Sequence, residues 1–537
     1  MTRTQRFTLA ATGLGLFMIF LDALIVNVAL PSIQQDFRVG ESGLQWVVTA
    51  YSLGMAVAIM SAGTLADIFG RKRLYLAGIA LFTASSVACG MAGSLDLLNA
   101  ARAVQGVAAA TVNVTSLALV SAAFPDPKQK AWAIGIWTAI AATATAVGPT
   151  LGGLLVERSG WRVIFLVNVP VGLAVIGLTL RFVAESRDER PRRFDVSGQL
   201  LFIAAVGAFA FAVIEGPRAG WTSAMILSLF LLAAAALAAF LFVERRSDDP
   251  MMDLTLFRDR TYSLAIVTIF AVLFAAYGML LVVTQYLQNV RGFSPTKAGL
   301  LLLPYSAMCT LVSLRAGRLV AVVGSRRLIL LGLTSQIVGL AVMSVGLGWG
   351  TPIVVAGLAF SALGSSLCLT PITSLAMTAV PSERAGMASG IMSAQRALGS
   401  TVGFAVLGSV LAASLTATLA AHLAQSLPDP VERREVAATI IDNANPRAYA
   451  AEIGPGRPIR HVDDRTRRAI LAAADRDFVE GIRISLAAAI AVLGLVLAAG
   501  YRYFPRGTRG IADARREAGA LESEEAHRET PEGGIAG

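Results

Sequence analysis

Apolar segments of about twenty residues recur along the whole chain and leave few folds open to it. The hydrocarbon core of a bilayer is about 30 Å thick, so a helix needs roughly 20 residues to cross it. Fourteen such segments are present: 9–30, 46–66, 74–94, 97–123, 131–155, 163–184, 197–214, 223–243, 262–288, 298–322, 327–347, 352–379, 386–415 and 483–503. Because backbone polar groups must be satisfied inside a bilayer, the sequence predicts an all-helical membrane protein.

Composition and charge indicate lipid, not nucleic acid, as the surroundings of the chain. Of the 537 residues, 55% are hydrophobic and only 15% are charged, whereas about a quarter are charged in soluble proteins. The net charge of +10 comes from short clusters of Lys and Arg between apolar runs and in the C-terminal tail. Anionic membrane lipid is therefore the expected partner of these clusters, and we expect no nucleic acid partner.

The loops between the apolar segments orient the chain. Basic clusters begin at Arg3, Arg71, Lys128, Arg187, Arg245 and Arg326, before the first span and after the even-numbered spans that follow. Since Lys and Arg in short loops stay in the cytoplasm, this pattern predicts a bacterial inner-membrane protein with both termini cytoplasmic. The segment 416–482 is then an extracytoplasmic loop, and the polar tail 504–537 is predicted to be disordered and cytoplasmic.

One loop occurs twice. Segment 63–73 follows the second span, and segment 317–327 follows the tenth. The matching positions are Gly63 with Gly317, Leu65 with Leu319 and Gly70 with Gly324, each repeat ending in a basic pair. This repeat indicates duplicated halves, which are typical of alternating-access carriers with the substrate site at the interface between the halves.

Several motifs carry a family resemblance. They are Gly63–Leu74, Leu98–Gly106, Gly148–Gly153, Leu21–Pro31 and Trp161–Pro170. The first three resemble the loop signature, the second motif and the antiporter motif of the major facilitator superfamily. The last two are similar to signatures of its fourteen-span drug:proton antiporters. The chain departs from the usual pattern at Ile68, where the loop signature has Arg, and at Ala144, where the antiporter motif has Gly.

The resemblance implies a major facilitator fold with two six-helix halves, inverted repeats and two extra transmembrane helices, fourteen in total. We expect an N-terminal half at 1–185, the two inserted helices at 186–260 and a C-terminal half at 261–503. The resemblance also implies a cytoplasmic gate formed by Gly63, Asp67, Gly70, Arg71 and Lys72. It implies a hinge and seal formed by Gly148, Pro149, Gly152 and Gly153, whose small side chains let helices approach closely.

Asp22 and Arg102 are the predicted proton-coupling residues. An ionised group at the centre of a membrane costs roughly 2.5 to 3.5 kcal/mol, so such residues are usually functional. Asp22 lies about 20 Å along the first span from its cytoplasmic start, and Arg102 about 7 to 8 Å along the descending fourth span from its outer start. They therefore lie at similar depth. Burial favours the neutral acid and Arg102 favours the carboxylate, as a proton carrier requires; a static ion pair is the alternative.

Six further side chains are candidates for contact with the substrate: Trp46, Tyr51, Tyr277, Gln285, Tyr286 and Arg396. The alternative for the aromatic residues is a lipid-facing or interfacial position, which is common for Trp and Tyr in membrane helices. Arg396 and Arg315 both lie within apolar spans. Either arginine is expected to line the cavity or to extend its charged end to an interface.

The sequence thus predicts a proton-driven exporter of amphiphilic drugs, with tetracycline-like and spectinomycin-like compounds as candidates. We expect a monomer. We also expect no cofactor, because the chain has no nucleotide-binding phosphate loop and the proton motive force would supply the energy. The rival hypotheses are an exporter of an endogenous metabolite or lipid, and a receptor that keeps the fold without transport. An enzyme is disfavoured, since His422, His461 and His527 all lie outside the predicted spans.

Overall fold

The computed structural model describes residues 1–187, 195–247, 250, 252–380, 385–425, 427, 429–442 and 464–504. These residues form helices and no strand. The helices are α1 (Arg3–Phe37), α2 (Glu41–Phe69), α3 (Arg71–Gly90), α4 (Leu95–Ala123), α5 (Pro127–Ser159), α6 (Val163–Leu166), α7 (Asn168–Phe182), α8 (Val196–Ala219), α9 (Ala224–Glu244), η1 (Leu254–Arg258), α10 (Arg260–Gln285), η2 (Tyr286–Val290), α11 (Pro295–Val323), α12 (Ser325–Trp349), α13 (Thr351–Thr378), α14 (Ala385–His422), η4 (Leu423–Gln425), α15 (Pro430–Asp442) and α16 (Asp464–Tyr503).

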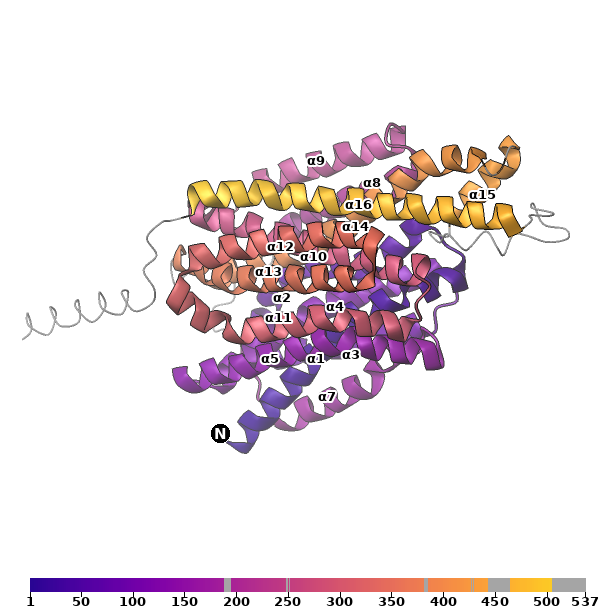
Figure 1. Cartoon of the computed structure of the whole chain (residues 1–537). Helices are drawn as coiled ribbons and strands as arrows, with labels where there is room; N and C mark the ends of the chain where they lie inside the picture. Colours follow the sequence, from indigo (N-terminus) through magenta and orange to yellow (C-terminus); the bar gives the residue numbers. More distant parts are fainter. Residues whose placement is uncertain are drawn as a thin grey trace, which may run out of the picture.

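The long helices lie side by side in one elongated bundle (Figure 1). Helices α1 to α7 form the N-terminal half and α10 to α16 the C-terminal half, and the halves meet where α2 packs on α14 and α5 packs on α11. The predicted all-helical fold is confirmed. Among the described residues, eleven helices are long and apolar enough to span a membrane, or twelve when a bent α2 is included. The count of fourteen spans stays a prediction.

The duplicated loops have the same backbone geometry. Gly70 separates α2 from α3 with φ 99° and ψ 134°, and Gly324 separates α11 from α12 with φ 86° and ψ 147°. Side chains other than glycine rarely adopt such angles, so the two glycines let each helix pair turn within one residue. We call the end of the bundle with these two turns the basic-loop end. It is the left end in Figure 1, where the N-terminus also lies.

The opposite end of the bundle, which we call the α15 end, differs from the loop predicted at 416–482. Helix α14 continues to His422 and α16 begins at Asp464, so much of this segment is helical. Leucine, valine and isoleucine side chains from α14, α15, α16 and the connection between α14 and α15 form a separate buried cluster: Leu419, Leu423, Leu427, Val436, Ile440 and Ile470. Because these apolar groups pack on each other, the three helices extend past the main bundle (Figure 1).

The inserted hairpin of α8 and α9 covers the seam between the two halves. Helix α8 packs against both α2 and α14. Towards the basic-loop end, the Gln199 amide donates a hydrogen bond of 2.6 Å to the backbone oxygen of Val57 on α2. Towards the α15 end, the Ser409 hydroxyl on α14 donates to the backbone oxygen of Val213 at 2.7 Å. The hairpin is therefore bonded to both halves of the protein.

Replacing Gly70 with Ala should lower the apparent Tm of the purified protein. The positive φ is nearly exclusive to glycine and an added Cβ would lie 2.9 Å from the Glu185 carboxyl carbon, so we expect a loss of about 1–3 kcal/mol. Gly177→Ala is the matched control, because that glycine lies within α7 with nothing near its missing Cβ. A thermal scan that shows equal Tm values for the two variants would contradict the proposed strain at Gly70.

Candidate functional site

A carboxylate and a guanidinium are fully buried together in the N-terminal half. Asp22 on α1 and Arg102 on α4 are both 0% exposed, and Arg102 Nη1 lies 2.5 Å from Asp22 Oδ2. The second carboxylate oxygen accepts hydrogen bonds from the Gln105 amide at 3.0 Å and the Asn168 amide at 2.9 Å. Both amides also donate to the Ser86 hydroxyl on α3. Four helices, α1, α3, α4 and α7, thus meet at this carboxylate.

Arg102 has further partners on its other sides. Its Nε donates to the backbone oxygen of Val47 on α2 at 3.1 Å, and its Nη1 donates to Gln105 Oε1 at 2.7 Å. The guanidinium carbon lies 4.3 Å from the ring centroid of Tyr51, a cation–π distance. The Tyr51 hydroxyl in turn donates to the backbone oxygen of Ile19 on α1 at 3.0 Å. These contacts compensate much of the burial of the cation, and of its nitrogens only Nη2 is buried without a hydrogen-bond partner among the described residues.

The structure therefore brings together the two residues predicted for proton coupling, and it adds partners that sequence reasoning missed. Gln105 and Asn168 lie within two of the family motifs, but no role was predicted for them. A polar amide inside an apolar span is the signal that could have identified both, because burying an unpaired amide is costly. Chemically, the negative charge of this carboxylate is held by one guanidinium and two amide donors, so a change in that charge would alter its contacts with α4 and α7. The role of the pair in coupling stays a prediction.

The antiporter motif on α5 has two contact faces. A Cβ on Gly148 would lie 3.3 Å from Leu24 Cβ, and one on Gly152 would lie 2.6 Å from Ile25 Cγ1, so this row faces α1 next to Asp22. Gly153 faces the other half of the protein, where a Cβ would lie 2.7 Å from the Thr296 Cα on α11. The small residues therefore let α5 pack closely against both α1 and α11.

Hydrogen bonds between the two halves lie towards the α15 end. The Gln288 amide on η2 donates to the backbone oxygen of Val28 on α1 at 3.0 Å. The Thr296 backbone N–H on α11 donates to Glu157 on α5 at 3.3 Å, and the Ser409 hydroxyl donates to Gln45 on α2 at 3.3 Å. Together with the close approach of α5 and α11, these contacts hold the halves together at this end.

At the basic-loop end, the gate motif forms a local network. Asp67 accepts from the Arg71 guanidinium at 2.9 Å, and both side chains are partly exposed. The backbone N–H groups of Lys72 and Arg73 at the start of α3 donate to the Glu185 carboxylate at 2.9 and 3.2 Å. Glu185 was not predicted, because it lies more than a hundred residues away and only folding places it at this helix N-terminus. Gly63 is partly buried on α2, with Val114 as its neighbour.

The predicted substrate-contact residues do not form one group. Tyr51 is buried against Arg102, and the Trp46 indole donates to Glu215 of the inserted hairpin at 3.0 Å. Tyr286 is 1% exposed, with its hydroxyl donating to the backbone oxygen of Leu347. Gln285 is buried, Tyr277 packs edge-on against Phe404, and Arg396 is partly buried beside Thr373.

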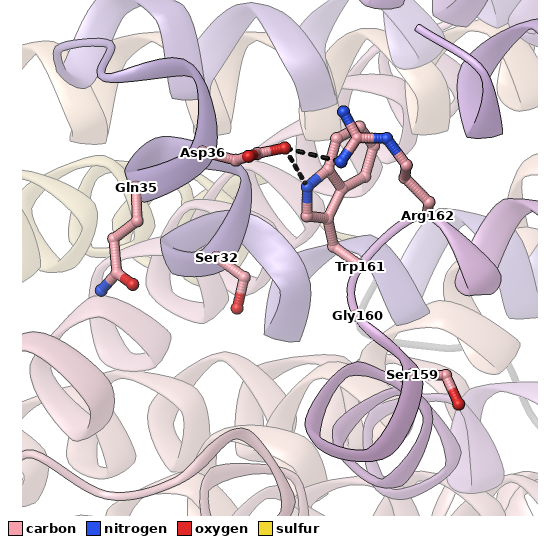
Figure 2. Close-up of a pocket in the computed structure, with 7 residues that line it drawn as sticks. All are labelled: Ser32, Gln35, Asp36, Ser159, Gly160, Trp161 and Arg162. Carbon is pink, nitrogen blue, oxygen red and sulfur yellow. Dashed lines mark hydrogen bonds and ion pairs between the residues drawn. The ribbon is translucent and has the colours of Figure 1, made fainter. Parts of the chain in front are cut away.

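A surface hollow of about 390 Å³ lies at the far end of α1 (Figure 2). The residues that line it are Ser32, Gln35, Asp36, Ser159, Gly160, Trp161 and Arg162. Asp36 accepts from the Trp161 indole at 3.0 Å and pairs with Arg162 at 2.6 Å, as the dashed lines show. Asp36 lies about 21 Å along the helix from Asp22, so this hollow is separate from the buried pair. Its contacts join the end of α1 to the segment between α5 and α6.

The family model of the Major Facilitator Superfamily matches residues 12–404. The chain belongs to this superfamily. This major facilitator is therefore a multi-pass membrane transporter. Its two halves, the repeated glycine turns and the antiporter motif are the family features that the sequence indicated.

Curated relatives cover almost the whole chain. The multidrug resistance protein Stp of Mycobacterium tuberculosis is 60% identical over 506 residues, which are 94% of this chain and 93% of that protein. The drug efflux pump JefA of the same organism is 44% identical over 94% of this chain and 99% of its own length. The tetracenomycin C resistance and export protein of Streptomyces glaucescens is 33% identical over 92% of this chain and 90% of its own.

A solved structure has the same fold. The inward-facing, unoccupied crystal structure of a bacterial homologue of the human lysosomal transporter Spinster gives a TM-score of 0.61. It is 15% identical in sequence, and the match covers 94% of this chain and 98% of that one.

A pair of variants should show that Asp22 and Arg102 stabilise each other. Arg102→Gln leaves the Asp22 carboxylate buried without its cation, and removing one partner of a buried pair typically costs about 3–5 kcal/mol. The double variant Asp22→Asn, Arg102→Gln leaves no unpaired charge, so we expect its Tm to exceed that of Arg102→Gln alone. Thermal unfolding of purified protein measures both. Additive losses from the two substitutions would show that the residues are not energetically coupled.

The contact of Glu157 with α11 should depend on pH. Hydrogen bonds from Thr296 and Ser294 hold the pKa of Glu157 below its ordinary value of 4.5. A lowered pKa means that the contact with α11 is stronger when Glu157 is ionised. The stabilisation of this contact is therefore present at neutral pH and is lost as the pH falls through the lowered pKa. Glu157→Gln should therefore lengthen the distance between spin labels on α5 and α11 at the α15 end at pH 7.

The same measurement has a built-in control. Glu480→Gln removes another exposed acid at the α15 end, one that pairs only with Arg483 on its own helix. This variant should leave the α5–α11 distance unchanged. If Glu157→Gln also leaves the distance unchanged at pH 7, the carboxylate does not hold the two helices together.

Proposed function

We propose that this protein is a proton-coupled antiporter that exports amphiphilic drugs across the bacterial inner membrane. The basic-loop end and both termini are cytoplasmic in this proposal, and tetracycline-like and spectinomycin-like compounds are candidate substrates. The buried Asp22–Arg102 pair is the observation that carries the proposal. Relatives named for multidrug resistance and drug efflux, over nearly the full chain, support the substrate class.

Protonation of Asp22 would act directly on the packing of α1. The carboxylate is bonded to side chains on α4 and α7, and loss of its charge weakens the ion pair with Arg102 and both amide hydrogen bonds. Helix α1 also contacts the glycine row of α5 beside Asp22 and accepts the Gln288 hydrogen bond from the other half. A proton on Asp22 can therefore change the contacts that hold the two halves together.

The direction of the cycle follows from the contacts between the halves. The halves are bonded at the α15 end, so the described arrangement is closed on the side that we assign to the exterior. Export requires a second arrangement that is open at the α15 end, in which the Val28–Gln288 and Glu157–Thr296 hydrogen bonds break. In this cycle Asp22 takes up a proton from the exterior while the protein is open at the α15 end, and release of that proton to the cytoplasm restores the ion pair of the described arrangement.

The proton gradient supplies enough energy for this task. One proton that crosses about 100 mV releases roughly 2.3 kcal/mol, and each pH unit adds about 1.4 kcal/mol. A sum of about 3.7 kcal/mol sustains a drug gradient of several hundredfold, since each 1.4 kcal/mol corresponds to a factor of ten. Proton drive therefore suffices without a nucleotide.

The Asp22→Asn variant tests the coupling. In cells that overexpress the protein, the wild type should lower the accumulation of a drug until a protonophore is added, whereas Asp22→Asn should give no proton-driven efflux at equal expression. Asp36→Asn is the matched control, because this acid lies on the same helix but pairs with Arg162 at the surface. It should retain efflux.

Two results would contradict the proposal. Efflux by Asp22→Asn at the wild-type rate would remove this residue from the mechanism, and efflux that persists with the protonophore would reject proton drive. If the wild type changes the accumulation of no drug, the rival exporter of an endogenous metabolite or lipid becomes the better hypothesis.

A further inference from the structure

The C-terminal half holds a second arginine within the membrane bundle, and its surroundings differ from those of Arg102. Arg396 lies on α14, eleven residues after the start of the helix at Ala385, or about 16 Å along its axis. Its side chain is partly buried, and its Nη2 donates a hydrogen bond of 2.8 Å to the Thr373 hydroxyl on α13. The Nε atom is buried without a partner.

Among the described residues, no carboxylate lies within ion-pair distance of Arg396. Arg102 has Asp22, an amide oxygen and a backbone oxygen around its guanidinium. An arginine in an apolar helix needs compensation for its lost hydration, and elsewhere in this protein an anion provides it. Within the described residues, the positive charge of Arg396 therefore has no anionic partner, whereas Arg102 forms a neutral pair with Asp22.

Thr373 fixes the position of this charge. Its hydroxyl donates to the backbone oxygen of Leu369 at 2.7 Å, so its oxygen is free to accept from Arg396. Only one guanidinium edge is used by this bond. The planar guanidinium has five N–H donors in a fixed fork. This fork can donate to both oxygens of one anionic group, which the compact ammonium of a lysine does less well.

We propose that Arg396, oriented by Thr373, binds an oxygen anion of the exported molecule, such as a carboxylate or a delocalised enolate. The inference rests on the proposed export function and narrows its substrates to amphiphiles that carry such an anion. Of the two candidate compound types, it favours the tetracycline-like type, with its acidic enol system, over the amine-rich spectinomycin-like type. Arg396 is then a specificity-determining residue.

The test compares two dyes that share one tricyclic ring system and differ in charge. Fluorescein is an anion and rhodamine 123 is a cation. Fluorescence polarisation measures the Kd of each dye for the purified full-length protein in neutral detergent. We expect the wild type to bind fluorescein more tightly than rhodamine 123, and Arg396→Gln to weaken fluorescein binding about tenfold or more while changing rhodamine 123 binding little.

Further variants separate charge from folding. Arg396→Lys keeps the charge but not the fork and should bind fluorescein with intermediate affinity. Thr373→Val should weaken fluorescein binding less than Arg396→Gln does. Arg315→Gln is the matched control, because Arg315 also lies in an apolar span of this half but is exposed, with a long contact of 3.5 Å to Leu311 on its own helix. It should leave both Kd values unchanged.

The anion at Arg396 could also come from a lipid headgroup, and a second arm of the experiment tests this source. Phosphatidylglycerol added to the detergent should leave fluorescein binding unchanged if the site serves the substrate. If this lipid displaces fluorescein from the wild type but not from Arg396→Gln, the site binds lipid and the proposal is overturned.

Three other results would also overturn it. They are equal binding of the two dyes by the wild type, an equal loss for both dyes in Arg396→Gln, and unchanged fluorescein binding in that variant. The Kd measurements do not depend on proton drive. If the export assays fail but binding at Arg396 is charge-selective, the proposed function is rejected and the anion site at Arg396 stands.

Discussion

The N-terminal half depends on one interaction, the buried ion pair of Asp22 and Arg102. Neither charge could remain in an apolar bundle alone, because the loss of hydration would exceed what packing returns. Their partners come from five helices: α1, α2, α3, α4 and α7. The pair therefore decides which faces of these helices point inward, and a change in its protonation affects the whole half and not a single side chain.

Glycine rows connect this pair to the seam between the halves. One face of α5 packs on α1 at Leu24 and Ile25, and the adjoining face packs on α11 near Thr296. Backbones that approach this closely have few alternative arrangements, because no side chain can reposition to fill a gap. In the proposed cycle, a movement of α1 at Asp22 would therefore displace α5 at its contact with α11.

The two halves have related loops but different interiors. Gly70 and Gly324 repeat the same turn, whereas Arg102 is neutralised by Asp22 and Arg396 has only Thr373 as a described polar partner. In the proposed cycle, this asymmetry assigns proton exchange to one half and contact with the exported molecule to the other. The hairpin of α8 and α9 joins the halves from outside, with hydrogen bonds to Val57 on α2 and from Ser409 on α14. It limits how far they can separate along that side.

The sequence by itself determined the helical membrane fold, the duplicated loop, the family and the two charged residues of the buried site. These features are encoded locally, in apolar runs, in glycines before basic pairs and in charges where lipid disfavours them. Only the tertiary structure decided that Asn168 reaches Asp22 across 146 residues and that Glu185 caps α3. It also decided that Tyr51 faces Arg102 and that α15 packs against α14 and the start of α16. Hydropathy predicts that a residue is buried, but the neighbour that it meets depends on how distant helices pack, which no local pattern records.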